Sequence, residues 1–317
     1  MIRASKVSLP GVWAVIGLLW LPWGHAAEVI LAIPSGLPAP ARHGLAAMTA
    51  ALTEAGAVVR PVADLGRIPA GKPAVVAGLA DGLWFRAPAL AGAIEGLPQS
   101  PESLAIRRVV AEGGPMLVLA GRDGVGLMYA ALEVADAVRA AGADWESALA
   151  DLPETVEAPF LEERAVSMYT MHRGWFERRL HDEDHWRRYF DLLARSRINS
   201  FVVIFGYENG GFMAPPYPFF FDVPGFPEVE MVGLDAAEQE ANRQAFQRLI
   251  DLAHERGIRV TPAIWDHIYR GGVQGGGIAG ANERVGRRVP GLVAGVTAGT
   301  LLAYTRAATA RCLEVFT

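Results

Sequence analysis

Hydrophobic residues in the first half of the chain recur in short runs separated by helix-length stretches, the pattern of an α/β layer. Four such runs predict strands, at 28–34, 73–78, 103–110 and 115–121. Gly113-Gly114 between the last two predicts a hairpin. Helices are predicted over 42–55 and 127–142, with Asp123 as a helix N-cap before the second. We therefore expect a small N-terminal α/β sandwich domain over 28–150.

Residues 151–160 lack hydrophobic periodicity and contain Pro153 and Pro159, which predicts an inter-domain linker. The hydrophobic pattern changes after it. Strands are then predicted at 164–170, at 199–207, where the apolar run is nearly continuous, and at 258–265, which is expected to be buried. They alternate with helices predicted at 184–195, 236–256 and 298–316. Since a complete (β/α)8 barrel needs roughly 250 residues, these three βα units predict an incomplete TIM barrel over 161–317.

The connections after these strands are long and rich in aromatics and glycine, whereas the returns are short. In parallel βα folds the loops that follow the strands build the site. Candidate site residues on these loops are His172, Arg173, Trp175, Glu208, Asn209, Trp265, Asp266 and His267. Arginine forks and carboxylates bind hydroxyl groups, and an aromatic face stacks on a pyranose ring. The loops therefore predict a sugar-binding face.

Structural explanations compete with these functional ones. Asp266 and His267 are the weak candidates for acid–base chemistry, and a buried Asp–His pair that only supports its loop explains them equally well. Glu208 and Asn209 directly follow a predicted strand, where they could contact a substrate or form a merely structural turn. For Asp182, Glu183 and Asp184 we expect a structural role at the start of a helix rather than a role in a site, because acidic side chains interact favourably with the positive end of a helix. For the aromatic residues of the second loop we expect self-packing rather than a substrate subsite; they are Tyr217, Phe219, Phe220 and Phe221.

Other motifs add no chemistry. GRDGVG at 121–126 lacks the third glycine of a dinucleotide-binding loop, so an N-cap and a tight turn explain it. His181 and His185 have a zinc-ligand spacing without the HExxH glutamate. No GxSxG elbow and no Cys/His nucleophile arrangement is present. We expect no cofactor and no metal.

The N-terminus and the composition indicate the compartment. Arg3 and Lys6 precede an apolar run and a small-residue junction, which predicts a signal peptide over 1–26 with cleavage near Ala26 and a periplasmic or secreted protein. No stable membrane anchor is expected after cleavage, because the run is shorter than a bilayer span. A net charge of −5 disfavours nucleic acid as a partner. Cys312, the one cysteine, excludes an intrachain disulfide and is expected to be a buried thiol.

Two segments resemble glycoside hydrolases of families 20 and 67 and related bacterial α-glucuronidase-like proteins. Residues 101–138, with GRDGVG before a helix, resemble the end of their N-terminal non-catalytic α/β domain. EERAVSMYTMHRGWF and HWRRYFDLLARSRINSFVVIF are similar to their first barrel unit. The resemblance implies that Arg164 holds sugar hydroxyls. Tyr169 stands where family 20 has an aspartate, which departs from the pattern.

The resemblance implies an exported glycoside hydrolase that acts on oligo- or polysaccharides. These families carry their catalytic carboxylates on the fourth strand or later, so we expect them beyond Thr317 and expect no glycosidase activity from this polypeptide alone. Two alternatives remain: a non-catalytic carbohydrate-binding surface protein, and a barrel lyase or esterase that uses Asp266 and His267. An open sheet edge also predicts aggregation or degradation. The oligomeric state is not predicted.

Overall fold

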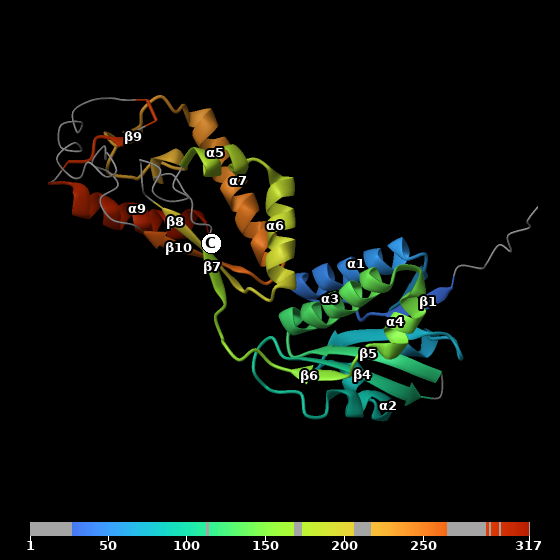
Figure 1. The fold of residues 1–317 in the computed structure, drawn as a ribbon. Coiled ribbons are helices and arrows are strands. Elements are labelled where there is room, and N and C mark those ends of the chain that lie inside the picture. The colour runs from blue at the N-terminus through green and yellow to red at the C-terminus, as the bar shows by residue number, and fades with distance from the viewer. Residues whose placement is uncertain are drawn as a thin grey trace, which may run out of the picture.

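The computed structural model describes residues 27–111, 114–167, 173–205, 217–264, 290–291, 293–297 and 299–316. The strands of this part of the chain form a six-stranded sheet of order β2-β1-β3-β5-β4-β6, a three-stranded sheet of order β10-β8-β7, and a small pair, β11-β9. Figure 1 shows the two larger sheets in separate units, with helices packed on each. The predicted fold class, a small α/β layer followed by an unclosed parallel βα sheet, is confirmed.

The N-terminal unit is built on a mixed sheet. Its strands are β1 (Glu28–Ala32), β2 (Val58–Val62), β3 (Ala74–Leu79), β4 (Leu104–Ala111), β5 (Gly114–Gly121) and β6 (Thr155–Glu157). β1, β2, β3 and β5 are parallel, whereas β4 pairs antiparallel with β5 and β6. The predicted hairpin is confirmed, because Ala111 pairs with Gly114. β6 lies within the segment predicted to be a linker and extends the sheet at its edge.

Helices cover both faces of this sheet. α1 (Ala39–Glu54), α3 (Gly124–Ala141) and α4 (Trp145–Asp151) lie on one face, whereas α2 (Pro88–Ala91) lies on the other (Figure 1). Short 3-10 turns complete the unit: η1 (Leu65–Arg67), η2 (Leu83–Arg86), η3 (Gly92–Ile94) and η4 (Gly142–Asp144). Asp123 caps α3 as predicted, since its Oδ1 accepts from the backbone N–H groups of Val125 and Gly126 at 3.0 and 2.9 Å.

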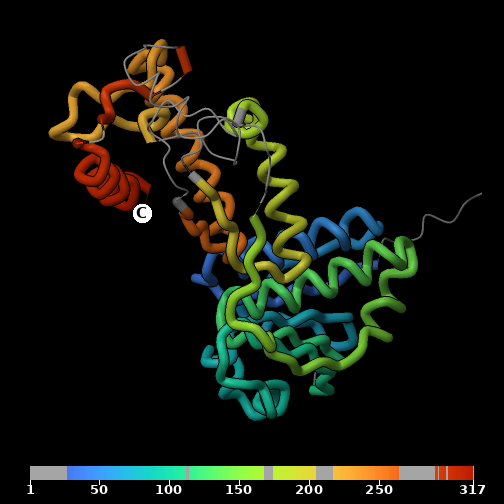
Figure 2. Tube along the Cα trace, turned by 60° about the vertical axis from the view of Figure 1, so that its left-hand side comes forward, coloured from blue at the N-terminus to red at the C-terminus, as the bar shows by residue number. Residues whose placement is uncertain are grey.

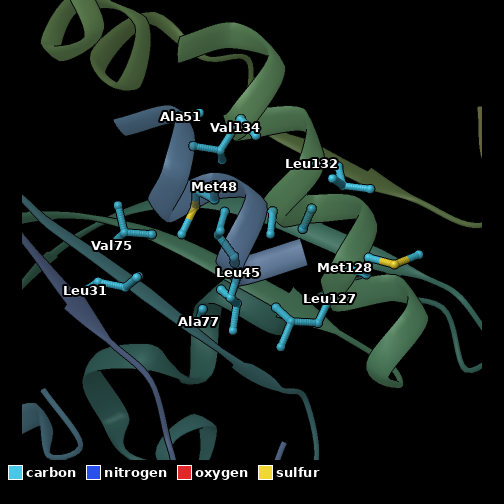
Figure 3. Packing of buried hydrophobic residues seen from close by; sticks show 14 of the residues in the cluster. Leu31, Leu45, Met48, Ala51, Val75, Ala77, Leu127, Met128, Leu132 and Val134 are labelled. Atoms are coloured by element: carbon cyan, nitrogen blue, oxygen red, sulfur yellow. The ribbon is translucent and has the colours of Figure 1, made fainter. Parts of the chain in front are cut away.

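α1 and α3 approach each other closely above the sheet. A Cβ on Gly44 would lie 2.7 Å from the Cα of Met128, so only glycine permits this separation. Figure 3 shows Leu45 and Met48 of α1 between the helix pair and the strands that carry Leu31 and Val75. All of these side chains are almost completely buried, and the unit therefore has a core of its own.

The second unit consists of parallel βα crossovers. Its strands are β7 (Ala165–Ser167), β8 (Ser200–Phe205) and β10 (Arg259–Ile264). α5 (Arg173–Leu180) and α6 (Glu183–Arg195) connect β7 to β8, and α7 (Ala236–His254) connects β8 to β10. α9 (Leu301–Val315) follows β10. The amphipathic pattern predicted α6 and α7 to within two residues at each end.

The three-stranded sheet buries one face. Phe201 and Val203 of β8 are fully buried against the helices, where Trp186 and Phe190 contact the Phe201 ring. Their neighbours Val202 and Ile204 point the other way and are only half-buried. On this second face Ala165, Ser167 and Thr261 are exposed. Among the described residues no further strand pairs with β7 or β10, and the barrel is therefore not closed.

Residues 217–221, in the connection after β8, belong to a compact aromatic cluster. Tyr217, Phe219, Phe220 and Phe221 are buried, and Phe220 and Phe221 both contact Phe316. The predicted self-packing of these residues is confirmed. The cluster includes η5 (Tyr217–Phe219) and adjoins β9 (Glu230–Met231), which pairs with β11 (Val293–Ala294). The pair joins the connections that follow β8 and β10.

Cys312 is buried in α9, and burial raises the pKa of its thiol to about 12. It is protonated at neutral pH and therefore fits the structural role predicted for it. No helix in the described ranges is both long enough and apolar enough to cross a bilayer.

Candidate functional site

The parallel strands of the second unit end at one edge. Ala165, Ser200 and Arg259 lie level at the amino ends, and Ile264 pairs with Phe205 at the carboxyl ends. All connections that follow β7, β8 and β10 therefore leave from the same edge, where parallel βα folds carry their sites. Figures 1 and 2 show that this edge faces away from the N-terminal unit.

Most of the predicted site residues follow this edge directly in the sequence. His172, Glu208, Asn209, Trp265, Asp266 and His267 lie outside the described residues. Arg173 is the first residue of α5, and Trp175 lies two residues further along the same helix turn. The topology brings the three connections to a common edge. That the candidate side chains on them lie close together stays a prediction.

Trp175 belongs to an aromatic group on α5 and α6. Its half-buried ring meets His185 edge-on, with ring centres 5.6 Å apart and planes at 77°. His185 stacks on Tyr189 with nearly parallel planes. Burial and the neighbouring Arg179 charge lower the pKa of His185, so its imidazole is neutral at pH 7. Trp175 and Tyr189 also pack against the core of this unit, so the group is a half-buried, uncharged aromatic cluster. An aromatic ring face can pack against the apolar face of a sugar ring.

The acidic residues at the start of α6 have structural partners. Asp182 caps the helix through the His185 N–H at 3.0 Å and pairs with Arg179 at 2.7 Å. Glu183 binds Arg187 and Arg248. Hydrogen bonds from these partners hold the pKa values of both carboxyls below their usual range. The structural explanation of these residues is thus the correct one.

The two histidines with zinc-like spacing are not brought together. His181 Nε2 lies 3.0 Å from Asn242 Oδ1 on α7, whereas His185 packs in the aromatic group. Within the described ranges, no group of three or more His, Cys, Asp or Glu side chains is arranged to hold a metal ion.

Arg164 does not lie where the resemblance implied. It immediately precedes β7 and is therefore at the amino edge, opposite the connections that carry the candidate site. Its guanidinium binds Glu102, the Tyr129 hydroxyl at 3.2 Å and the Arg197 carbonyl at 2.5 Å. The guanidinium donors thus point to protein groups at the junction with the N-terminal unit. The prediction that Arg164 holds sugar hydroxyls does not fit this placement.

A groove is formed by residues 218–239, in the connection between β8 and α7 and the first turn of α7. It has a volume of about 710 Å³, and its walls combine Phe226 and several prolines with three carboxylates, Asp222, Glu230 and Asp235. Gln239 Nε2 donates to Asp222 Oδ1 at 3.0 Å and fixes that side chain. Sequence reasoning missed these residues, because it considered only Glu208, Asn209 and the aromatic residues of this connection.

Comparisons with known proteins bear on the fold. Neither a protein-family model nor a curated protein matches this chain. Among solved structures, a GH138 enzyme targeting pectin rhamnogalacturonan II is similar, with a TM-score of 0.54 and 18% identity over 76% of this chain and 31% of that one. The chain has a glycoside-hydrolase-like fold. It spans about a third of the GH138 enzyme's length.

Other neighbours are more distant. A family GH115 4-O-methyl-α-glucuronidase with specificity for decorated arabinogalactans has a TM-score of 0.43 and 16% identity, covering 73% of this chain and 28% of that one. A GH84 protein has a TM-score of 0.38, with 12% identity over 75% of this chain and 33% of that one. Similarity at this level supports no argument about function. The narrower resemblance to families 20 and 67 is not shown.

Proposed function

We propose that this chain carries the sugar-binding edge of an exported glycoside hydrolase that acts on oligo- or polysaccharides. The observation that supports this most is the parallel sheet itself. Three connections leave from one edge, in a fold similar to that of a GH138 enzyme. These connections contain the arginine, tryptophan, histidine and carboxylate residues predicted to bind sugars.

The chemistry of the connections suggests an acidic sugar. Arg173 and His172 follow β7, and a guanidinium fork binds a carboxylate through two parallel hydrogen bonds. Pectin, the polymer targeted by the GH138 neighbour, is a reasonable source of such sugars. Hydrolysis itself requires two carboxylates. Asp266, two residues after the end of β10, and His267 next to it in the sequence are the weak candidates for acid–base chemistry.

A binding experiment tests the proposal. Pectin-derived acidic oligosaccharides and neutral cello-oligosaccharides would be titrated into residues 27–317 by calorimetry. We expect the acidic ligands to bind with a Kd of about 1 mM or tighter. Trp175→Ala should weaken binding about tenfold through lost stacking. Arg173→Ala should abolish the preference for acidic over neutral ligands.

Glu163→Gln is the matched control. Glu163 is exposed at the amino edge, where it pairs with Arg259 at 3.7 Å, so its substitution should leave binding unchanged. Absence of binding to either ligand class, or equal binding by Trp175→Ala and the parent protein, would contradict the proposal. The same samples test turnover on an aryl-glycoside panel, where hydrolysis would show that these connections also carry the catalytic carboxylates.

Export is a separate part of the proposal. Residues 1–26 would be removed at the membrane, so the mature protein would begin near Ala27. N-terminal sequencing of protein recovered from the periplasm or medium of a bacterial host tests this directly. An intact Met1 in that fraction would contradict cleavage.

A further inference from the structure

A network of polar side chains lies at the amino edge of the three-stranded sheet, where the N-terminal unit meets it. The network centres on Glu102, Tyr129, Arg164 and Asn199. Glu102 and Tyr129 come from the N-terminal unit, and Arg164 and Asn199 from the second unit. None of these residues is part of the proposed sugar-binding edge, which lies at the opposite ends of the strands.

Asn199 ties the amino ends of all three strands together. Its N–H donates to the Arg164 carbonyl at 3.1 Å, and its own carbonyl accepts from the Arg259 N–H at 3.0 Å. Its side-chain oxygen accepts from the Arg164 N–H at 2.9 Å. Its amide nitrogen donates to Glu102 Oε1 at 2.7 Å and to the Glu162 carbonyl at 2.8 Å. At 4% exposure, this side chain has a partner for each of its polar atoms.

Glu102 reaches this network from a constrained turn. Its φ of 63° is in the left-handed region, which a glutamate adopts at a cost. The turn is held because the Glu102 N–H donates to Asp123 Oδ2 at 2.9 Å, while the other Asp123 oxygen caps α3. A Cβ on Gly126 would collide with the Ser103 carbonyl. The GRDGVG sequence therefore serves to bring α3 against this turn and to aim Glu102 at the second unit.

The Glu102–Arg164 pair is substantially shielded, with side-chain exposures of 14% and 17%. Burial alone would lower the pKa of Arg164, but the hydrogen bond and charge of Glu102, aided by Tyr129, outweigh it and raise the pKa. Loss of one partner from a shielded pair leaves an uncompensated charge, which is far more destabilising than loss of an exposed pair.

Apolar contact between the units is limited by comparison. Ala194 of α6 joins the N-terminal core, and Gly257 packs on Val125. Other described links are half-exposed ion pairs, such as Arg197–Glu133 at 2.6 Å and Arg195–Asp136 at 2.9 Å, the pair of His43 with Asp191 at 3.4 Å, and the Arg197 guanidinium over the Tyr129 ring. Units joined by a small interface normally move relative to one another. A shielded charged network is the feature here that opposes such motion.

We propose that Glu102 is an inter-unit lock: through Arg164 and Asn199 it holds the amino ends of β7, β8 and β10 to the N-terminal unit, and makes the two units unfold as one cooperative body. The lock acts independently of any carbohydrate. Its removal would release the second unit first, because the described residues leave one face of its sheet exposed at Ala165, Ser167 and Thr261.

Glu102→Gln tests the lock, with Glu133→Gln as the matched control. Glu102→Gln keeps the shape and the acceptor for Asn199 but removes the charge that binds Arg164. By calorimetry, the parent protein should show a single unfolding transition. Glu102→Gln should show two, the lower at a melting temperature about 5–10 °C below the parent. Hydrogen exchange of the Ser200 and Arg259 amides should accelerate at least tenfold, with β5 amides unchanged.

Glu133→Gln removes only an exposed inter-unit pair and should keep one transition close to that of the parent. Two transitions in the parent, or a single transition in Glu102→Gln shifted no further than in Glu133→Gln, would overturn the proposal. If Glu102→Gln does not yield soluble protein, Arg164→Lys replaces it. That variant keeps a cation for Glu102 but loses the planar guanidinium that also donates to Tyr129 and the Arg197 carbonyl, so a melting temperature lowered no further than in Glu133→Gln would overturn the proposal.

Discussion

The two main sheets differ in how they are covered. Helices lie on both faces of the six-stranded sheet, so β1, β3 and β5 bury almost every side chain. In the three-stranded sheet, Phe201 and Val203 are buried under helices, whereas Val202 and Ile204 are only half-buried on the second face. Parallel strands are normally buried on both faces. In the described part of the chain, the sheet of the N-terminal unit is therefore covered on both faces, and that of the second unit on one.

The residues that stabilise the parallel sheet and those predicted to bind sugar therefore lie at opposite edges of it. The N-terminal unit contributes a core and the Glu102 network at one edge of the parallel sheet. The opposite edge carries the long connections with the predicted sugar-binding residues. The N-terminal unit contacts the second unit at the amino edge of the parallel sheet. Ligand contacts are therefore expected at the opposite, carboxyl edge.

The largest expected effect is in the half-covered unit. Trp186 is 1% exposed, contacts Phe176, Phe190 and Phe201, and donates from Nε1 to the Arg179 carbonyl at 2.9 Å. Trp186→Ala should reduce the free energy of unfolding by about 3–5 kcal/mol. Urea titration followed by circular dichroism measures it. A loss below about 1 kcal/mol would mean that this core contributes little.

A glycine substitution probes the close packing of the N-terminal unit. Gly126→Ala places a methyl group against the Ser103 backbone carbonyl, which cannot move without disturbing the Glu102 turn. We expect destabilisation of about 1–3 kcal/mol. Gly92→Ala is the control, since its Cβ would meet open space and its φ is −66°. Equal melting temperatures for the two variants would contradict the packing argument.

Loss of the α3 cap should cost less. Asp123 accepts from the N–H groups of Val125, Gly126 and Glu102, so Asp123→Ala should destabilise by about 1–2 kcal/mol. Asp235→Ala removes a comparable cap from α7, where Asp235 accepts from the Glu238 N–H at 2.8 Å. Thermal melts compare the two. A larger loss for Asp235 would show that the connection of Asp123 to the Glu102 turn adds nothing.

The smallest expected effect is the pH dependence of the exposed ion pairs. Hydrogen bonds from Arg243 and Gln244 lower the pKa of Glu240 to about 2, below the value of about 4.3 expected in the unfolded chain. Its stabilisation is therefore complete above pH 4.3 and is lost as the pH falls through the folded pKa. Glu240→Gln should slightly flatten the decline in melting temperature between pH 4.3 and 2. An unchanged decline would contradict this assignment.

The sequence predicted those elements whose physical cause is local. The α7 helix, with its Asp235–Glu238 capping box, and the strands β8 and β10 are encoded by periodicity and turn residues. The predicted burial of β10 is wrong, because its described side chains are exposed or half-buried on an edge strand of the sheet. β2 was missed because its VVRPV sequence is largely exposed, and β6 because three residues between prolines carry no pattern. Both are strands only through pairing with distant segments.

For the site, sequence pattern identified which edge to examine but not the position of Arg164. Its neighbours in the structure, Glu102 and Tyr129, are 62 and 35 residues away in the chain. Hydrophobic periodicity cannot predict a contact between residues so far apart in the sequence. The left-handed turn at Glu102 and the Gly126 contact with Ser103 are likewise tertiary effects. The alternative explanations of Asp182, Glu183 and the aromatic loop were correct, because helix capping and local packing act over a few residues.

Hydrogen exchange measured by mass spectrometry, with and without pectin-derived oligosaccharide, tests the central claim that the two edges of the parallel sheet have different roles. Ligand should slow exchange in peptides covering 168–175, 206–216 and 265–289, which follow the carboxyl edge. Exchange at the amino edge, in 158–164 and 196–200, should stay unchanged. Protection confined to the amino edge, or none at any saturating ligand concentration, would contradict the account.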